Sequence, residues 1–369
     1  MKYNNRDISC NLLLVISLMF LSQLVSAQTL ASKIDWIRPV GKKSPAVWGI
    51  KNGVVFGLWP YALESSGEVM GGGPRGLIRI GYEFKGTINH INYIAVEPVV
   101  KNQIEFSEIS PSKVDEKWGK FMWTSDNNNP GEFLPSAISS GIITHPDPNN
   151  PDIEQLSLYV FMEKFLNGAH PYLKISLRSD RPEEICLEIF NQENSAAMER
   201  CTLTATMGNY SRLRLLHLKN QVIDSRQLYK GFEGIDFVEK EGYPAEQMLK
   251  DKNGDLIVIA EPNESFAALS AWPQTADYFE RRNWRYRPFF KVNQYWRKEK
   301  SQYDPSLHVR VNGRTKYWSG GTNDKTRYVN IPGGPAFENF ELREKYYPGQ
   351  KFYFGITRKA TAQLVEPNK

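Results

Sequence analysis

The sequence is poor in cysteine and histidine, and it has only one long apolar run, near its start. Among 369 residues there are 3 cysteines and 5 histidines, and their spacing matches no HExxH motif or zinc-type cysteine cluster. The sequence contains no nucleotide-binding fingerprint, and without a Gly-x-Ser-x-Gly elbow a serine hydrolase is disfavoured. Stretches with the 3.6-residue period of a helix are scarce, which argues against a helical fold.

The one long apolar run, residues 12–24, has the setting of an export signal. Basic residues precede it, and Val25-Ser26-Ala27 follows it in the small-x-small pattern of a cleavage site. The run is short for a transmembrane helix, although an uncleaved anchor is the alternative. We therefore expect residues 1–27 to be a signal peptide. The mature chain, from Gln28, would be secreted or periplasmic and have no membrane span.

The mature chain is mildly basic and long enough for a sizeable core. Removal of residues 1–27 lowers the formal net charge from +5 to +4, which does not indicate a nucleic-acid partner. We expect residues 28–369 to form a single large β-sandwich domain, with a weak subdivision near residue 270 where Trp, Tyr and Arg become frequent. Cys186 and Cys201 remain, either as a disulfide or as two thiols.

Short apolar or alternating runs broken by Gly, Pro, Asn and Asp dominate the chain. Residues 172–178 alternate apolar and polar side chains, as a half-buried strand does. Asn52-Gly53 and Asn253-Gly254 lie between β-prone runs and predict tight hairpin turns. Residues 245–250 and 338–345 each allow a turn or two of helix. The pattern predicts an all-β fold: a β-sandwich, jelly roll or supersandwich with long loops and few short helices.

Three segments predict single functional side chains. Gly71-Gly72-Gly73-Pro74-Arg75-Gly76 predicts a tight turn whose Arg75 holds a carboxylate or sulfate, or else a flexible hairpin loop. Glu97 lies in the apolar run 91–100, where burial would raise its pKa as a general acid requires. Strand alternation also allows Glu97 to face water. His170, at the entrance to a strand, is a candidate for proton transfer.

Two further segments combine basic and aromatic residues. Tyr210, Arg212 and Arg214 alternate, so on a regular strand they would share one face that suits a uronate, or form an ordinary charged surface. Residues 278–300 interleave rings and cations. Trp284, Tyr286 and Trp296 are the rings that we expect to contact a ligand, while simple core packing explains part of the pattern.

The chain resembles secreted proteins that bacteria use to degrade polysaccharides. The resemblance lies in the signal peptide, the all-β pattern, the aromatic-rich loops and the segments 71–76 and 208–214. It implies a sandwich fold and a polysaccharide or oligosaccharide substrate, and it transfers no catalytic residue.

The residues leave the reaction open. A lyase that acts on a uronate-containing polysaccharide neutralises the uronate carboxylate and removes the C5 proton. The candidates for these roles are Tyr210, His170, Arg212 and Arg214. We place this reaction slightly ahead of hydrolysis. A glycoside hydrolase needs two carboxylates, for which Glu97 and Glu163 are candidates. The alternative is a non-catalytic glycan-binding or envelope protein. No cofactor or metal site is predicted, and a structural calcium ion is left open.

Overall fold

The computed structural model describes most of the chain from Ile34 onward. The described residues are 34–41, 44–58, 75–129, 138–206, 212–234, 238–265, 267–268, 284–285, 290–318 and 328–366. The chain divides into two units, Met1–Lys33 and Ile34–Lys369, and the described residues all belong to the second. The predicted signal peptide, residues 1–27, lies outside the described residues.

The described chain is almost entirely β-structure. A hydrogen-bonded sheet of 22 strands doubles back on itself to form two layers, and a separate hairpin joins β21 (Lys316–Trp318) to β22 (Tyr328–Asn330). Short helical segments are α2 (Ser225–Leu228), η2 (Ala245–Gln247) and α4 (Thr361–Leu364). The all-β prediction is confirmed.

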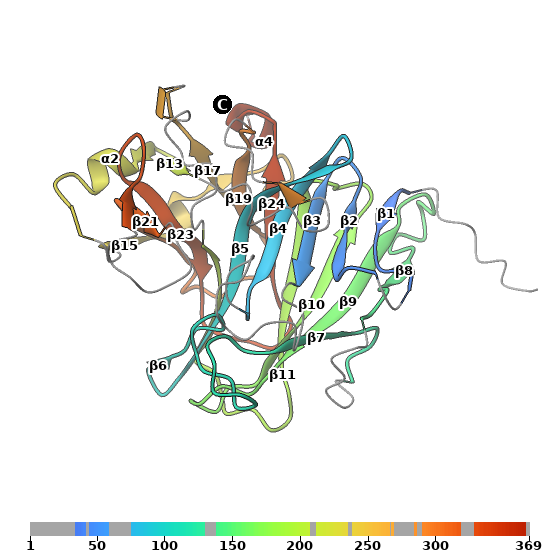
Figure 1. The fold of residues 1–369 in the computed structure, drawn as a ribbon. Coiled ribbons are helices and arrows are strands. Elements are labelled where there is room, and N and C mark those ends of the chain that lie inside the picture. Colours follow the sequence, from blue (N-terminus) through green and yellow to red (C-terminus); the bar gives the residue numbers. More distant parts are fainter. Residues whose placement is uncertain are drawn as a thin grey trace, which may run out of the picture. The chain divides into compact units, whose positions relative to one another are not determined.

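Layer 1 contains the strands nearest the N-terminus and runs on into C-terminal ones. Figure 1 shows β2, β3, β4 and β5 side by side within it. Its order is β1 (Trp36–Ile37), β2 (Val47–Ile50), β3 (Val54–Leu58), β4 (Ile78–Phe84), β5 (Thr87–Val100), β12 (Arg200–Thr206), β23 (Ala336–Arg343), β20 (His308–Arg314) and β15 (Val238–Pro244), with β6 (Gln103–Ile104) and β18 (Trp284–Arg285) also on β5.

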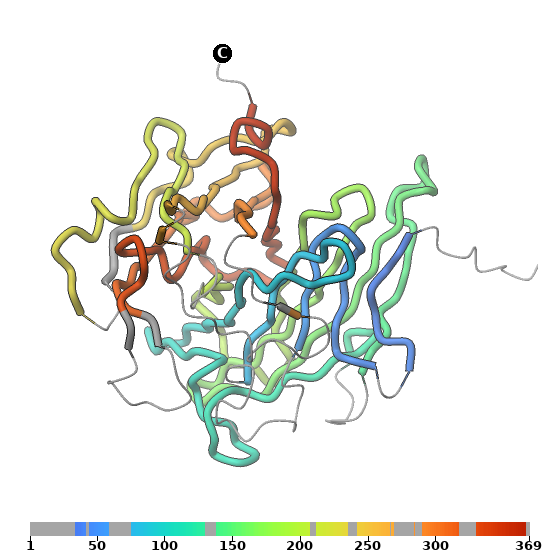
Figure 2. Tube along the Cα trace, turned by 45° about the horizontal axis from the view of Figure 1, so that its top comes forward, coloured from blue at the N-terminus to red at the C-terminus, as the bar shows by residue number. Residues whose placement is uncertain are grey.

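Layer 2 is built from the middle of the chain and its end. In Figure 2 its green strands lie beside the blue strands of layer 1. Its order is β9 (Gln155–Met162), β10 (Pro171–Arg178), β11 (Glu184–Asn191), β24 (Gln350–Thr357), β19 (Asn293–Lys298), β17 (Leu256–Pro262), β13 (Leu213–Leu218) and β14 (Gln221–Asp224), with β7 (Met122–Ser125) and β8 (Ile142–Thr144) on β9 and β16 (Leu249–Lys250) on β17.

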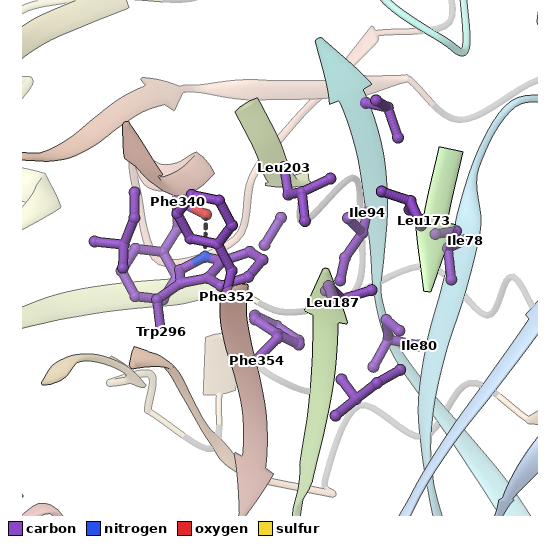
Figure 3. Packing of buried hydrophobic residues seen from close by; sticks show 14 of the residues in the cluster. Ile78, Ile80, Ile94, Leu173, Leu187, Leu203, Trp296, Phe340, Phe352 and Phe354 are labelled. Atoms are coloured by element: carbon purple, nitrogen blue, oxygen red, sulfur yellow. Dashed lines mark hydrogen bonds between the residues drawn. The ribbon is translucent and has the colours of Figure 1, made fainter. Parts of the chain in front are cut away.

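The hydrophobic core lies between the two layers. Ile94 and Leu203 of layer 1 meet Leu187 and Trp296 of layer 2 there, and all four are nearly or fully inaccessible to water. Figure 3 shows the Trp296 ring packed among phenylalanine rings, with its Nε1 donating a 2.7 Å hydrogen bond to the Phe340 carbonyl. Burial of this apolar surface is the main force that holds the layers together.

Strand β13 joins the layers. It pairs with β17 and β14 of layer 2, and its first residue, Leu213, pairs with Phe337 of β23 in layer 1. The register on β17 shifts between Leu213 and Leu215, which is a β-bulge.

The strand pattern confirms most of the local predictions. Turns at Asn52-Gly53 and Asn253-Gly254 connect the antiparallel pairs β2–β3 and β16–β17. The prediction of helix at residues 338–345 is wrong, because residues 336–343 form β23. Phe340 and Leu342 alternate with charged side chains there, which is the period of a strand.

Cys186 and Cys201 are free thiols. Cys186 lies in β11 and Cys201 in β12, so the strands of different layers keep them apart. Burial raises the pKa of Cys186 to about 12 and raises that of Cys201 as well. Among the described residues, no helix has the length and apolar character needed to cross a membrane.

Candidate active face on layer 1

The side of layer 1 that faces away from layer 2 is unusually rich in charged and polar side chains; we call it the outer face. Along β5, Ile94 and Val96 point into the core, whereas Tyr93 and Glu97 point to the outer face. Charged side chains on the outside of a sheet normally reach water. Here Glu97 is only 2% exposed.

One row of polar side chains crosses five neighbouring strands in register. Arg79 pairs with Tyr93, Tyr93 with Thr206, Thr206 with Asn339, and Asn339 with Asn312. Side chains directly opposite each other on neighbouring strands stand about 5 Å apart. The Arg79 guanidinium lies 5.5 Å from the centre of the Tyr93 ring. The row therefore places a cation, a phenol, a hydroxyl and two amides in a line, and Arg79 and Tyr93 are buried there at 2% and 7% exposed.

A bulge brings His90 to the same face as Tyr93. Residues three apart on a regular strand point to opposite sides, but the β4–β5 register shifts so that Gly81 pairs with His90 and Ile80 with Asn92. Ile91 is the extra residue. As a result the His90 and Tyr93 rings lie 4.6 Å apart. Bulges often redirect a side chain beside an active site.

The His90 ring is held neutral by its surroundings. Burial lowers the pKa of His90 well below its usual value of 6.5, and the positive charge of Arg79 lowers it further. A neutral imidazole has one unprotonated nitrogen, as a general base requires.

Trp284, which the sequence predicts to bind a ligand, covers this part of the face. Its ring lies 5.7 Å from the His90 ring, and it is 4% exposed. Glycine beneath the ring makes room for it, because a Cβ at Gly81 would come within 2.7 Å of Trp284 and one at Gly57 within 3.2 Å. Trp284 thus adjoins His90, although sequence reasoning gave no reason to pair them.

A network of two carboxylates and two arginines lies next to the polar row. Glu341 pairs with both Thr204 and Arg310. It accepts hydrogen bonds from Thr204 Oγ1 at 2.6 Å, Arg310 Nη1 at 3.0 Å and Arg343 Nε at 2.5 Å. Arg343 Nη2 also lies 3.7 Å from Glu97 Oε2, so this arginine links the two carboxylates.

The surroundings of Glu97 raise its pKa above that of an ordinary carboxyl group. Burial raises the pKa of Glu97 to about 8, and the nearby charges of Glu341 and Glu108 act in the same direction. The Thr204 hydroxyl and Arg343 oppose the shift. Glu97 is therefore largely protonated at neutral pH, as predicted from its apolar strand.

Arg212 and Arg214 converge on a buried carboxylate, but not in the way that simple alternation predicts. Arg212 has a φ of 49°, and the bulge in β13 follows it. Arg212 Nε lies 3.5 Å and Arg214 Nη2 lies 3.7 Å from Glu264 Oε1. Burial lowers the pKa of Arg214 to about 10, although Glu264 opposes this. Tyr210 lies outside the described residues.

Arg75 holds a carboxylate of the protein itself, not an open site. Its two terminal nitrogens each lie 2.9 Å from the carboxylate of Asp115, and the guanidinium stacks on Phe121 at 3.9 Å. The side chain is 1% exposed. The prediction that its fork projects toward a ligand therefore finds no support. Tyr286 lies outside the described residues.

Three predicted site residues lie away from the outer face and contact other parts of the protein instead. They are His170, Glu163 and Trp296. His170 binds Asn194 Oδ1 through Nδ1 at 2.6 Å and contacts the Met162 carbonyl at 3.1 Å. Glu163 accepts from backbone N–H groups of the 113–121 segment. Trp296 is 0% exposed in the core, so no part of its ring is available to a sugar. The pairing of Glu163 with Glu97 is not observed.

Sequence reasoning missed five residues that the fold gathers around Glu97 and Trp284: Arg79, His90, Tyr93, Glu341 and Arg343. The alternation that directs Glu97 outward also directs Tyr93 outward, so the sequence pattern alone could have identified Tyr93. The others depend on strand register or on the bulge.

The described residues contain no group of three or more His, Cys, Asp or Glu side chains suited to a metal ion. Comparison with known proteins finds no matching family model, no matching curated protein and no matching solved structure. The fold class therefore comes from the structure alone: the chain is a large all-β protein with a predominantly antiparallel sheet.

Proposed function

We propose that the protein is a secreted or periplasmic carbohydrate-active enzyme that cleaves an acidic, uronate-containing polysaccharide by β-elimination. The observation that carries the proposal is the bulge at Ile91, which places a neutral His90 against Tyr93 with Arg79 beside them. These side chains match the roles that such a reaction needs. The export signal expected at residues 1–27 suits an extracellular substrate.

Each side chain has one role in the proposed step. Arg79 neutralises the uronate carboxylate, which makes the C5 proton more acidic. His90 takes that proton, the C5–H electron pair forms the C4=C5 double bond, and the C4–O4 bond breaks. Tyr93 donates its phenolic proton to the departing O4. Solvent then removes the proton from His90 and reprotonates Tyr93, so both residues return to their initial states.

The cationic character of the outer face supports an acidic substrate. Arg79, Arg200, Arg310 and Arg343 all lie on it. Glu97 and Glu341 pair with two of these arginines, Arg310 and Arg343, so the attraction of an anionic ligand would come mainly from Arg79 and Arg200. Trp284 supplies a ring at the same place for contact with the apolar face of a sugar.

Hydrolysis is the second candidate, and the Glu97–Arg343–Glu341 network favours it. Glycoside hydrolases use one protonated and one ionised carboxyl group. The raised pKa of Glu97 fits the general acid, and Glu341, held by two arginines, would be the partner.

Product analysis tests both candidates. Protein beginning at Gln28 is incubated with uronate-containing and neutral polysaccharides, and products are followed by ultraviolet absorbance and mass. Elimination gives unsaturated products that absorb in the ultraviolet, whereas hydrolysis gives products that contain an added water and do not absorb. Binding of a polysaccharide without any product would contradict both reactions and support a non-catalytic glycan-binding protein.

A further inference from the structure

A cavity of about 370 Å³ opens at the end of the outer face. Val99 of β5, Arg200 of β12 and His308 of β20 line it, together with Lys345. All of these belong to the described residues, and the volume is within the range of small-molecule sites. We call it the distal cavity.

The distal cavity is continuous with the charged network. Val99 follows Glu97 by two residues on the same face of β5 and pairs with Arg200, and His308 pairs with Arg343. At the usual rise of a strand, Val99 lies about 20 Å along β5 from Tyr93. A polymer that reacts beside His90 and extends along the strands would reach the cavity several sugar units away.

The side chains of the cavity favour an anion. Arg200, Lys345 and His308 are its basic groups. Of its two carboxylates, Glu344 is paired with a cation, since it accepts from Lys298 Nζ at 2.5 Å and also from Asp304 N at 2.9 Å, whereas Glu199 accepts from the backbone N of Asn102 at 3.3 Å and keeps its charge. Among the described residues, the basic groups of the cavity therefore outnumber its one carboxylate that has no cationic partner.

Two nitrogen atoms are placed to bind an acidic group. Within the described part of the chain, the buried Nε of Arg200 has no hydrogen-bond partner. His308 Nδ1 lies 2.9 Å from the Ser306 carbonyl, and since a carbonyl only accepts, Nδ1 carries the proton. In the imidazolium form Nε2 also carries a proton, which it can donate to a carboxylate, whereas in the neutral form Nε2 only accepts.

We propose that the distal cavity binds a second acidic sugar of the polysaccharide chain, with its carboxylate among Arg200, His308 and Lys345. This inference rests on the proposed function for the identity of the polymer. It adds that the enzyme recognises charge at a position remote from the bond that breaks, and so prefers chains to short fragments.

The direct test monitors His308. Its ring resonances are assigned by their loss in His308→Gln, and the protein is titrated with glucuronate, with galacturonate and with glucose. The expected result is a saturable shift of the His308 resonances with either uronate and none with glucose. An unchanged His308 with both uronates, or an equal response to glucose, would overturn the inference.

Variants of the cavity test its contribution to substrate binding. In Lys345→Ala we expect uronate to bind about five-fold more weakly, the scale of one exposed ion pair, and Arg200→Gln should weaken it further. Lys252→Ala, an exposed lysine in the β16–β17 turn, is the matched control and should leave binding unchanged. Unaltered affinity in both cavity variants would contradict the proposed contacts.

The two proposals fail separately. A His308 response without turnover of any uronate polymer would refute the enzyme and retain the cavity as an acidic-sugar site. Turnover of a uronate polymer without a His308 response would refute the cavity alone.

Discussion

The His90 and Tyr93 rings lie 4.6 Å apart on one face of β5, although three positions separate them in sequence. The extra residue Ile91 produces this arrangement. The bulge interrupts the regular pairing of two strands, and under the proposed function its role is to place His90 beside Tyr93.

If His90 and Tyr93 transfer protons, their removal should abolish turnover without unfolding the protein. In His90→Gln and Tyr93→Phe we expect kcat to fall roughly 10²–10⁴-fold, the usual contribution of a positioned acid or base. Turnover of the uronate polymer is measured after each variant is shown to unfold at a temperature near that of the wild type.

Tyr172→Phe is the matched control, because Tyr172 is a half-buried tyrosine of β10 in layer 2. It should retain wild-type kcat. Retention of full kcat by either His90→Gln or Tyr93→Phe would remove that residue from the mechanism.

Glu97 should make the protein less stable as the pH rises. Its folded-state pKa is raised from 4.5 to about 8, so between these values the folded protein holds a proton that the unfolded chain has lost. The free energy of unfolding therefore falls with increasing pH, by at most about 1.4 kcal/mol per pH unit. Glu97→Gln removes this dependence. Urea unfolding at several pH values between about 5 and 8 measures this pH dependence of the free energy of unfolding.

Glu338→Gln provides the comparison. Burial raises the pKa of Glu338 only to about 6, so its effect on the free energy of unfolding should be complete near that pH. A wild type and a Glu97→Gln variant with parallel pH profiles above pH 6 would show that Glu97 is ionised in the folded protein.

The two tryptophans of the basic, aromatic segment should respond differently to substitution. Trp296→Phe removes the hydrogen bond to the Phe340 carbonyl and part of a core ring, which we expect to cost about 1–3 kcal/mol of stability. Its KM for the polymer should not change. Trp284→Phe should raise KM several-fold, since its ring adjoins His90 on the outer face.

Urea unfolding and steady-state kinetics on the same preparations separate these effects. An increased KM in Trp296→Phe with unchanged KM in Trp284→Phe would reverse our assignment and return Trp296 to the binding site.

Two substitutions of Arg212 separate the effect of its backbone conformation from the effect of its side chain. Its φ of 49° lies in the left-handed region, which costs a residue with a Cβ about 1 kcal/mol or more relative to glycine. Both Arg212→Gly and Arg212→Ala lose the contact with Glu264. We therefore expect the glycine variant to be the more stable of the two by about 1 kcal/mol in urea unfolding.

Activity should not follow that order. If the guanidinium binds the uronate, both variants lose activity to the same extent. Full activity in Arg212→Ala would exclude the side chain from the site, and an alanine variant as stable as the glycine variant would contradict the backbone geometry.

The fold was predictable because its signals are local. Alternation along residues 172–178 and the turns at Asn52-Gly53 and Asn253-Gly254 depend only on neighbouring residues, and the structure confirms them. The helix expected at residues 338–345 failed because Glu338 and Glu341 also satisfy a helical spacing. Packing of Phe340 and Leu342 in the core selects the strand.

The site was predictable only in part, because it depends on contacts between distant segments. Period-two alternation sends Tyr93 and Glu97 to one face, but register alone determines that Arg79 and Asn339 join them in the same row. Nothing in the residue type distinguishes an arginine that meets a ligand from one, such as Arg75, whose partner Asp115 is supplied by the protein.

The shared strand β13 also bears on how the molecule comes apart. Since its hydrogen bonds extend to β17 in one layer and to β23 in the other, neither layer separates without disturbing its counterpart. Heating should therefore melt both in a single cooperative step, and damage to the core far from His90 should separate the His90 and Tyr93 rings at the same temperature at which the sheet is lost.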